Sequence, residues 1–171
     1  MVDGTITDTD SALLDAALAY WNASRSAGGL PSRDDIDPLD IPDLLPWISL
    51  IDVVREGARM RFRSRLVGTG VCDRFGRDIT GAFADELYDG AYLRRLNEGY
   101  GAIVHGRQPQ IWRCDVAAND DGRRSYSRVV MPLSSDGETV DMLFAAFDFG
   151  DPYPAPGRAW PQGQSTWREV G

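Results

Sequence analysis

The sequence is poor in the residue types that most often carry chemistry. Its 171 residues include one histidine and two cysteines, and all 18 basic residues are arginine because lysine is absent. A Ser-His-Asp triad would have to use His105, and no G-x-S-x-G nucleophile motif is present. Cys72 and Cys114 cannot form a metal cluster alone and lack the C-x-x-C spacing of a redox pair. We therefore expect two free thiols, no catalytic site and no metal site.

Positive charge and long apolar runs are also scarce. The net charge of -8 and the pI near 4.6 oppose binding to a phosphate polyanion, so we expect no nucleic-acid partner. The first ten residues carry acid where a signal peptide needs base, and no apolar run approaches the roughly 18 residues that span a bilayer. These absences predict a cytoplasmic protein without a membrane partner. The lack of lysine is read as a compositional habit of the source genome.

What is present suits one domain with flanking segments, because single domains most often run to roughly 100 to 150 residues. We predict an N-terminal helix within residues 1–29, a domain over residues 30–149, and an extended or disordered tail over residues 150–171. The tail is assigned from its content of proline, glycine and tryptophan. Prolines and aspartates interrupt every period between residues 30 and 46, which predicts an ordered acidic connector with a short helical turn.

The N-terminal segment predicts an amphipathic helix of about five turns. It would begin at an N-cap formed by Asp10 or Ser11 and stop at Gly28 or Gly29. Its apolar stripe contains Leu13, Leu14, Ala17, Leu18 and Trp21. Such a stripe needs a partner surface, which is either the domain's own sheet or a second copy of the chain. Leu13, Leu18 and Trp21 are therefore candidate interface residues.

Five strands are predicted, two before and three after a helical middle. They cover residues 47–54, 59–68, 109–117, 123–133 and 140–149, with turn-forming residues between neighbouring strands. The middle contains short helices broken at Gly76 and Gly81 and a longer helix that ends at Gly106. This order predicts an α+β fold, with a five-stranded antiparallel sheet and helices on one face.

The stretch "RMRFRSRL", residues 59–66, alternates arginine with apolar or small residues. On a half-exposed strand this pattern places the arginines on one face and Met60, Phe62, Ser64 and Leu66 on the other. The arginines are then a solvated face, paired with the acidic connector or with Glu56. The alternative is that Arg61 and Arg63 face a partner, since arginine is enriched at interfaces.

The chain resembles a PAS domain in its order of strand, strand, helices and three strands. More closely, it resembles a bacterial PAS-like family of short proteins, through "LPSRDDIDPLDIPDLLPWISLIDV" and "FRSRLVGTGVCDRFGRDITG". The match covers roughly residues 30 to 149. The resemblance implies a sensing or interaction module with a hydrophobic pocket between sheet and helices. It also implies dimerisation through the sheet or the flanking helix, and it does not identify a cofactor.

If the arginines point outward, the other face of that strand points at the pocket. With residues of the later strands, the candidate ligand-binding set is Phe62, Ser64, Leu66, Trp112, Tyr126, Arg128 and Met142. The register of the last strand stays open between Met142 with Phe144 and Leu143 with Ala145. For each of these residues simple core packing is favoured over ligand contact, because apolar strand residues usually just pack. Arg128 could meet an anionic ligand in bidentate fashion or pair with Asp115.

Two cofactors known from PAS domains, haem and covalently bound flavin, each require a particular residue in the sequence. His105 directly precedes Gly106, so we interpret it as a helix C-terminal cap and not as a haem ligand. Flavin photosensors of the class form an adduct with a cysteine in a "GRNCRFLQ"-like segment. The comparable segment here is "GRDITGAF", with Ile79 or Thr80 at the thiol position. Covalent flavin chemistry is therefore not expected, whereas non-covalent flavin binding stays open.

These patterns favour a stand-alone PAS-like sensory domain that binds a small molecule. Its signal would leave through a homodimer or a contact with another signalling protein. The alternative is a ligand-free dimerisation or interaction module with a filled core. No convergent acid–base constellation points to an enzyme.

Overall fold

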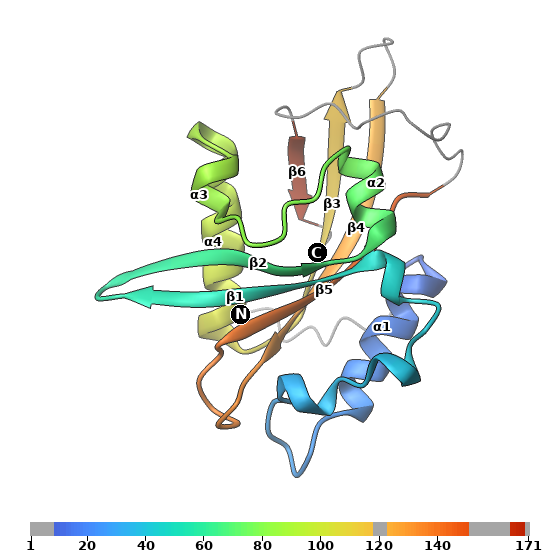
Figure 1. Ribbon diagram of the computed structural model, residues 1–171, viewed down its shortest axis with the longest axis vertical. Helices are drawn as coiled ribbons and strands as arrows, with labels where there is room; N and C mark the ends of the chain where they lie inside the picture. The colour runs from blue at the N-terminus through green and yellow to red at the C-terminus, as the bar shows by residue number, and fades with distance from the viewer. Residues whose placement is uncertain (1–8, 118–122, 151–164, 170–171) are drawn as a thin grey trace.

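The computed structural model describes residues 9–117, 123–150 and 165–169, and within these ranges six strands form one antiparallel sheet. The strand order is β2-β1-β5-β4-β3-β6 (Figure 1). The bounds are β1 Ile48–Glu56, β2 Arg59–Val67, β3 Gln110–Ala117, β4 Arg123–Leu133, β5 Met142–Asp148 and β6 Ser165–Glu169. The predicted α+β class and the five antiparallel strands are confirmed. β6 adds a sixth strand beside β3 from within the predicted tail, most of which lies outside the described residues.

Among the described residues, α1 and three short 3-10 turns precede β1, and three further α-helices connect β2 to β3. Their bounds are α1 Ala12–Ala23, η1 Arg33–Asp35, η2 Pro38–Asp40, η3 Leu45–Trp47, α2 Thr69–Phe75, α3 Ala84–Leu87 and α4 Gly90–Gly106. The predicted break at Gly76 is present, because this glycine adopts the left-handed conformation (φ 74°) that caps a helix. The helical turn predicted in the acidic connector around Ile41 to Leu45 is present, because the N–H groups of Leu44 and Leu45 donate to the Ile41 carbonyl. η3 follows it and leads directly into β1.

The N-terminal helix begins as predicted and ends early. The Ser11 side chain accepts a hydrogen bond from the backbone N–H of Leu14 and so caps α1. The helix spans 12 residues instead of about five turns, and Ser24 follows it. The predicted stop at Gly28 or Gly29 is therefore late, and by Ala27, which has positive φ, the backbone has already left the helical region.

Helices cover both faces of the sheet. α2, α3 and α4 pack on one face, as predicted, and α1 packs on the opposite face against β4 and β5. In Figure 1, α1 accordingly lies apart from α3 and α4. Leu14, Leu18 and Trp21 are buried, and the Trp21 indole N–H donates to the Pro132 carbonyl at 2.8 Å. The stripe therefore finds its partner in the chain's own sheet, the first of the two predicted outcomes.

The outer edge of β2 is closed by backbone from the segment that precedes α3. The Ser64 N–H donates to the Ala82 carbonyl at 3.0 Å, and the Gly81 N–H donates to the Ser64 carbonyl at 2.6 Å. A single antiparallel bridge joins Arg63 to Phe83. These contacts fix α3 beside β2 and over the face that carries α4.

Candidate functional site

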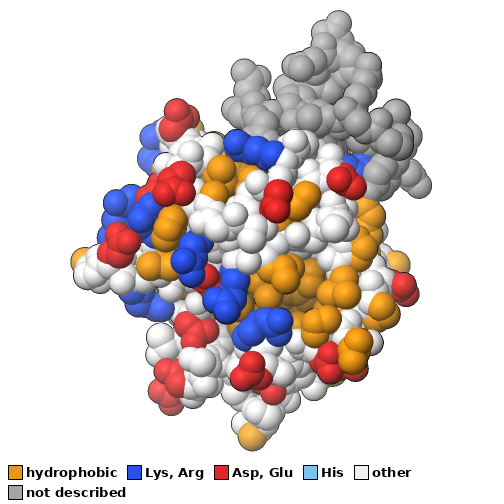
Figure 2. All heavy atoms as spheres, viewed as in Figure 1, with side chains coloured by type: hydrophobic (Ala, Val, Ile, Leu, Met, Phe, Trp, Pro, Cys, Tyr) orange, Lys and Arg blue, Asp and Glu red, His pale blue; other side chains and the backbone are white. Residues whose placement is uncertain are grey.

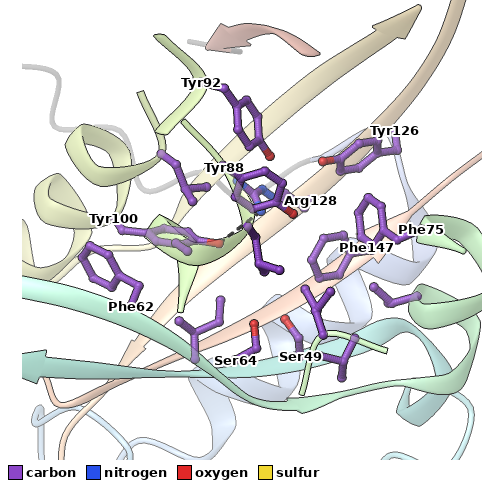
Figure 3. Close-up of a pocket in the computed structure, with 17 residues that line it drawn as sticks. Ser49, Phe62, Ser64, Phe75, Tyr88, Tyr92, Tyr100, Tyr126, Arg128 and Phe147 are labelled. Atoms are coloured by element: carbon purple, nitrogen blue, oxygen red, sulfur yellow. Dashed lines mark hydrogen bonds between the residues drawn. The ribbon is translucent and has the colours of Figure 1, made fainter. Parts of the chain in front are cut away.

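A cavity of about 50 Å³ lies between the sheet and helices α2, α3 and α4 (Figure 3). Its apolar and aromatic wall consists of Ile51, Phe62, Val67, Val71, Phe75, Ile79, Ala84, Leu87, Leu96 and Phe147. Its polar wall consists of Ser49, Ser64, Tyr88, Tyr92, Tyr100, Tyr126 and Arg128. A mostly apolar hollow with a few convergent polar groups is what a small-molecule site requires.

Arg128 is the one charged residue among the described residues that line the cavity, and it is only 4% exposed. It lies on β4, paired in register with Trp112 on β3 and Phe147 on β5. Its Nη1 donates to the Tyr100 hydroxyl at 3.2 Å. The guanidinium carbon lies 4.4 Å from the centroid of the Trp112 ring, within cation–π distance. Trp112 in turn stacks on Tyr100 at 5.3 Å, so aromatic rings hold the cation in place.

Four tyrosines surround this cation. Tyr92 and Tyr100 come from α4, Tyr88 follows α3, and Tyr126 shares β4 with Arg128. Figure 3 shows the hydroxyl ends of Tyr92 and Tyr126 directed toward the region of Arg128. Burial raises the pKa of all four phenols above its ordinary value. They are therefore neutral at physiological pH, and each brings a hydroxyl to the cavity without bringing charge.

Four of the seven predicted ligand-binding residues lie on the cavity wall, namely Phe62, Ser64, Tyr126 and Arg128. Trp112 lies behind Arg128, where it supports the guanidinium. Whether these residues bind a ligand stays a prediction. The alternative partner of Arg128, Asp115, has its side chain outside the described part of the chain.

Two of the predicted ligand-binding residues, Leu66 and Met142, do not line the cavity, in each case because of strand register. Ser64 pairs with Ile51 but Leu66 pairs with Leu50, so Arg65 is an extra residue in a β-bulge. The bulge reverses the alternation: Leu66 is 39% exposed and Val67 faces the cavity instead. Met142 pairs with Asp52, whereas Leu143 pairs with the cavity residue Ile51. Met142 therefore faces the α1 side of the sheet, which resolves the open register of the last strand.

The tyrosines of the helical side were missed at the sequence level. Tyr92, Leu96 and Tyr100 are spaced four residues apart and so share one face of α4. That spacing is visible in the sequence. Only the position of the helix over the sheet reveals that the face meets Arg128.

The arginines of β2 form ion pairs within the chain. Arg61 donates from Nε and Nη2 to the Asp85 carboxylate at 2.9 and 2.8 Å, and its guanidinium lies 3.8 Å from the Phe83 ring centroid. Arg63 donates to Asp52 at 2.7 Å. Figure 2 shows basic side chains on this face with acidic ones between them.

The predicted pairing of the arginines with Glu56 is present, since Arg61 contacts its carboxylate at 3.3 Å. No ion pair with the acidic connector occurs among the described residues; Asp85 and Asp52 take its place. A role of Arg61 and Arg63 in a dimer stays a prediction. Leu13 is partly buried, and Leu18 and Trp21 are buried in the core. Contact with a second copy through Leu18 or Trp21 would require α1 to leave the sheet.

Of the residues considered for cofactors, His105 and the two cysteines lie away from the cavity. The Nδ1 atom of His105 lies 2.7 Å from the Gly101 carbonyl oxygen of its own helix, as a C-terminal cap does. Cys72 and Cys114 are free thiols, as predicted, and neither lines the cavity. Of the two residues that could stand at the position of the flavin-reactive thiol, Ile79 lines the cavity and Thr80 does not. Across residues 9–117, 123–150 and 165–169, no cluster of three potential metal ligands occurs, and no helix is both long and apolar enough to cross a membrane.

Solved structures with a similar fold are LOV photoreceptor domains. The light-state structure of the blue-light photoreceptor Aureochrome1 LOV is 12% identical with a TM-score of 0.45, covering 66% of this chain and 88% of that one. The Rhodobacter sphaeroides LOV protein is 11% identical with a TM-score of 0.46, over 68% and 70%. A fungal LOV domain photoreceptor is 14% identical with a TM-score of 0.46, over 86% and 100%. At TM-scores below 0.5 these likenesses carry no argument.

Comparison with models of protein families assigns the chain to a family. No curated protein matches the chain. The family model described as "PAS domain" matches residues 9–147, which extends from just before α1 into β5. PAS domains are typically sensory and not catalytic, and the topology, the cavity between sheet and helices and this match agree. The chain belongs to the PAS domain family.

Proposed function

We propose that this chain is a sensory PAS domain that binds a small molecule in the cavity around Arg128 and is not an enzyme. The observation that carries the proposal is a buried cation on the wall of a hollow that otherwise consists of apolar and neutral polar groups. Burying a charge is costly unless its surroundings compensate it. A core with a purely structural role would be simpler to build from apolar residues alone.

A route from the cavity to the opposite face runs through the end of β5. Phe147 lines the cavity, and the next residue, Asp148, points to the other side of the sheet because strand side chains alternate. The Asp148 carboxylate accepts a hydrogen bond of 2.6 Å from Ser11, the residue that caps α1. Movement of Phe147 on ligand binding would thus reach the start of α1. The signal would then pass by contact to a second copy or to another signalling protein.

Native mass spectrometry of protein purified without added cofactor tests this proposal. We expect a species heavier than the chain, whose extra mass is lost when the same sample is denatured. In the Ser11→Ala variant the extra mass should remain, because Ser11 lies outside the cavity. Hydrogen exchange in α1 should respond to ligand in the unmodified chain and respond less in this variant. A clean apo mass under gentle conditions, together with no heat from any titrated probe, would contradict ligand binding.

The second candidate is a ligand-free interaction module, and the small size of the cavity favours it. About 50 Å³ is a third of the roughly 150 Å³ that holds benzene in an engineered protein cavity. The same spectrum separates the two candidates. An apo mass with a stable dimer supports the interaction module, whereas a bound mass supports the sensor.

A further inference from the structure

We infer that the ligand of this cavity is a short monocarboxylate, whose carboxylate meets Arg128 and whose alkyl end contacts the apolar wall. The inference rests on the proposed function and narrows it to one chemical class. Three features of the cavity carry it: the sign of its charge, the number of its charges and its size.

The sign follows from the composition of the wall. Among the described lining residues, Arg128 brings a permanent positive charge, four tyrosines and two serines bring neutral hydroxyls, and no acidic residue contributes. An anion is the ligand that this wall complements. The planar guanidinium presents parallel N–H donors, which match the two oxygens of a carboxylate. The tyrosine hydroxyls around Arg128 can donate to the same anion.

The number of charges selects a carboxylate over a phosphate. A carboxylate brings one negative charge to one arginine, so the buried pair is neutral. A phosphate monoanion or dianion is larger, and its second charge would stay uncompensated inside the domain. Val67, Val71, Ile79 and Leu96 offer no hydrogen bonds to further phosphate oxygens and instead suit an alkyl group.

Size sets the length of the chain. One water needs about 10 to 15 Å³ on the measure that gives 50 Å³ here, so the cavity holds about four non-hydrogen atoms. Acetate has that number of non-hydrogen atoms. Longer or aromatic carboxylates would require side chains of α3 or α4 to move outward.

Calorimetric titration of the full chain with matched probes tests the class. Sodium acetate, neutral acetamide and inorganic phosphate are titrated at pH 7 and constant ionic strength after exhaustive buffer exchange. We expect acetate to bind at least tenfold more tightly than acetamide, which has nearly the same shape without the charge. We also expect acetate to bind more tightly than phosphate. Equal affinity for acetate and acetamide, or tighter binding of phosphate, would overturn the inference.

Substitutions at two cavity residues, Arg128 and Ala84, test whether acetate binds in this cavity. Arg128→Gln should bring the affinity for acetate down to that for acetamide, with near-UV circular dichroism to establish that the variant is folded. Because a buried arginine can matter for folding, Ala84→Leu provides an independent test: it fills the cavity from α3 without touching the charge. Ala102→Leu makes the same change at an exposed position of α4 and is the matched control. Ala84→Leu should abolish acetate binding and Ala102→Leu should retain it; unchanged binding in Ala84→Leu would overturn the inference.

The native mass spectrum distinguishes failure of the inference from failure of the proposed function. A co-purified neutral molecule, or one too large for the cavity as it stands, leaves the sensor function intact and overturns the carboxylate class. An apo mass together with no heat from any probe overturns both.

Discussion

Gly99 determines how closely α4 approaches the aromatic support of Arg128. A Cβ atom at this position would lie 2.6 Å from the Trp112 ring, closer than such atoms approach in real structures. Trp112 is the ring on which the Arg128 guanidinium rests. Because Gly99 has no side chain, Trp112 and the Arg128 guanidinium that rests on it fit under α4.

We predict that Gly99→Ala destabilises the protein although alanine is the better helix former. The gain in helix propensity, about 0.5–1 kcal/mol, is smaller than the overpacking cost of about 1–3 kcal/mol. Gly101→Ala is the matched control, because nothing lies within 4 Å of its added Cβ and only the propensity gain remains. Compared with the unmodified chain, the urea midpoint of unfolding should be lower for Gly99→Ala and higher for Gly101→Ala. A raised midpoint for Gly99→Ala would show that the Trp112 ring can shift to make room for the added methyl group.

At the scale of elements, α3 depends on the charged contacts of β2. This helix has only four residues and could not persist alone. Asp85 joins it to Arg61, while the backbone of residues 81–83 pairs with β2. Ala84 and Leu87 of the same helix line the cavity, so the ion pair and this part of the cavity wall belong to one structural unit.

Replacing Arg61 should loosen that unit without unfolding the domain. In Arg61→Gln we expect the protection of the Tyr88 amide, which donates to the Ala84 carbonyl of α3, to fall about two- to fivefold, as suits a partly exposed ion pair. Arg65→Gln is the control, since Arg65 is more exposed and its contact with Asp52 is longer, at 3.6 Å. Hydrogen exchange followed by NMR measures both. Equal protection in the two variants would show that backbone pairing alone holds α3.

The ion pair between Arg61 and Asp85 predicts that the stability of the fold depends on pH. The hydrogen bond from Arg61 holds the pKa of Asp85 below its ordinary value of about 3.9. Asp85 therefore stabilises the fold fully above that value, and the stabilisation is lost as the pH falls through the lowered pKa. In Arg61→Gln the loss of stability between pH 7 and pH 3 should be smaller than in the unmodified chain. Urea midpoints at the two pH values give the comparison, and an identical loss would assign the acid sensitivity to other carboxylates.

The sequence predicts element types well here and side-chain faces less well. Alternation along residues 59–64 places Phe62 and Ser64 correctly on the cavity side. One inserted residue at Arg65 then moves Leu66 outward, and no local pattern announces such a bulge. The face of β5 could not be chosen, because Met142 and Leu143 are both apolar and both buried. The tyrosine cage required knowledge of where α4 crosses the sheet, which is a matter of tertiary packing.

For the molecule as a whole, α1 is part of the core and not an appendage. Leu14 is fully buried and Trp21 is 1% exposed, both against the face of the sheet opposite the cavity. Removing residues 1–28 would expose that apolar face. We predict that the shortened chain loses cooperative thermal unfolding or self-associates, as measured by circular dichroism and analytical ultracentrifugation. A folded, monomeric product would show that α1 can detach, as its proposed part in signalling would then require.

The outer strand of the sheet also bears on how this protein behaves in a crowded solution. β2 is an edge strand, and an edge with free N–H and C=O groups is a template on which other chains add and aggregate. Here residues 81–83 occupy part of the edge, and four arginines stand along the strand. A foreign strand would have to displace that backbone and disturb the ion pairs that these arginines form with Asp52 and Asp85. The alternating pattern of residues 59–66 thus protects the sheet against unwanted growth while its other side lines the cavity.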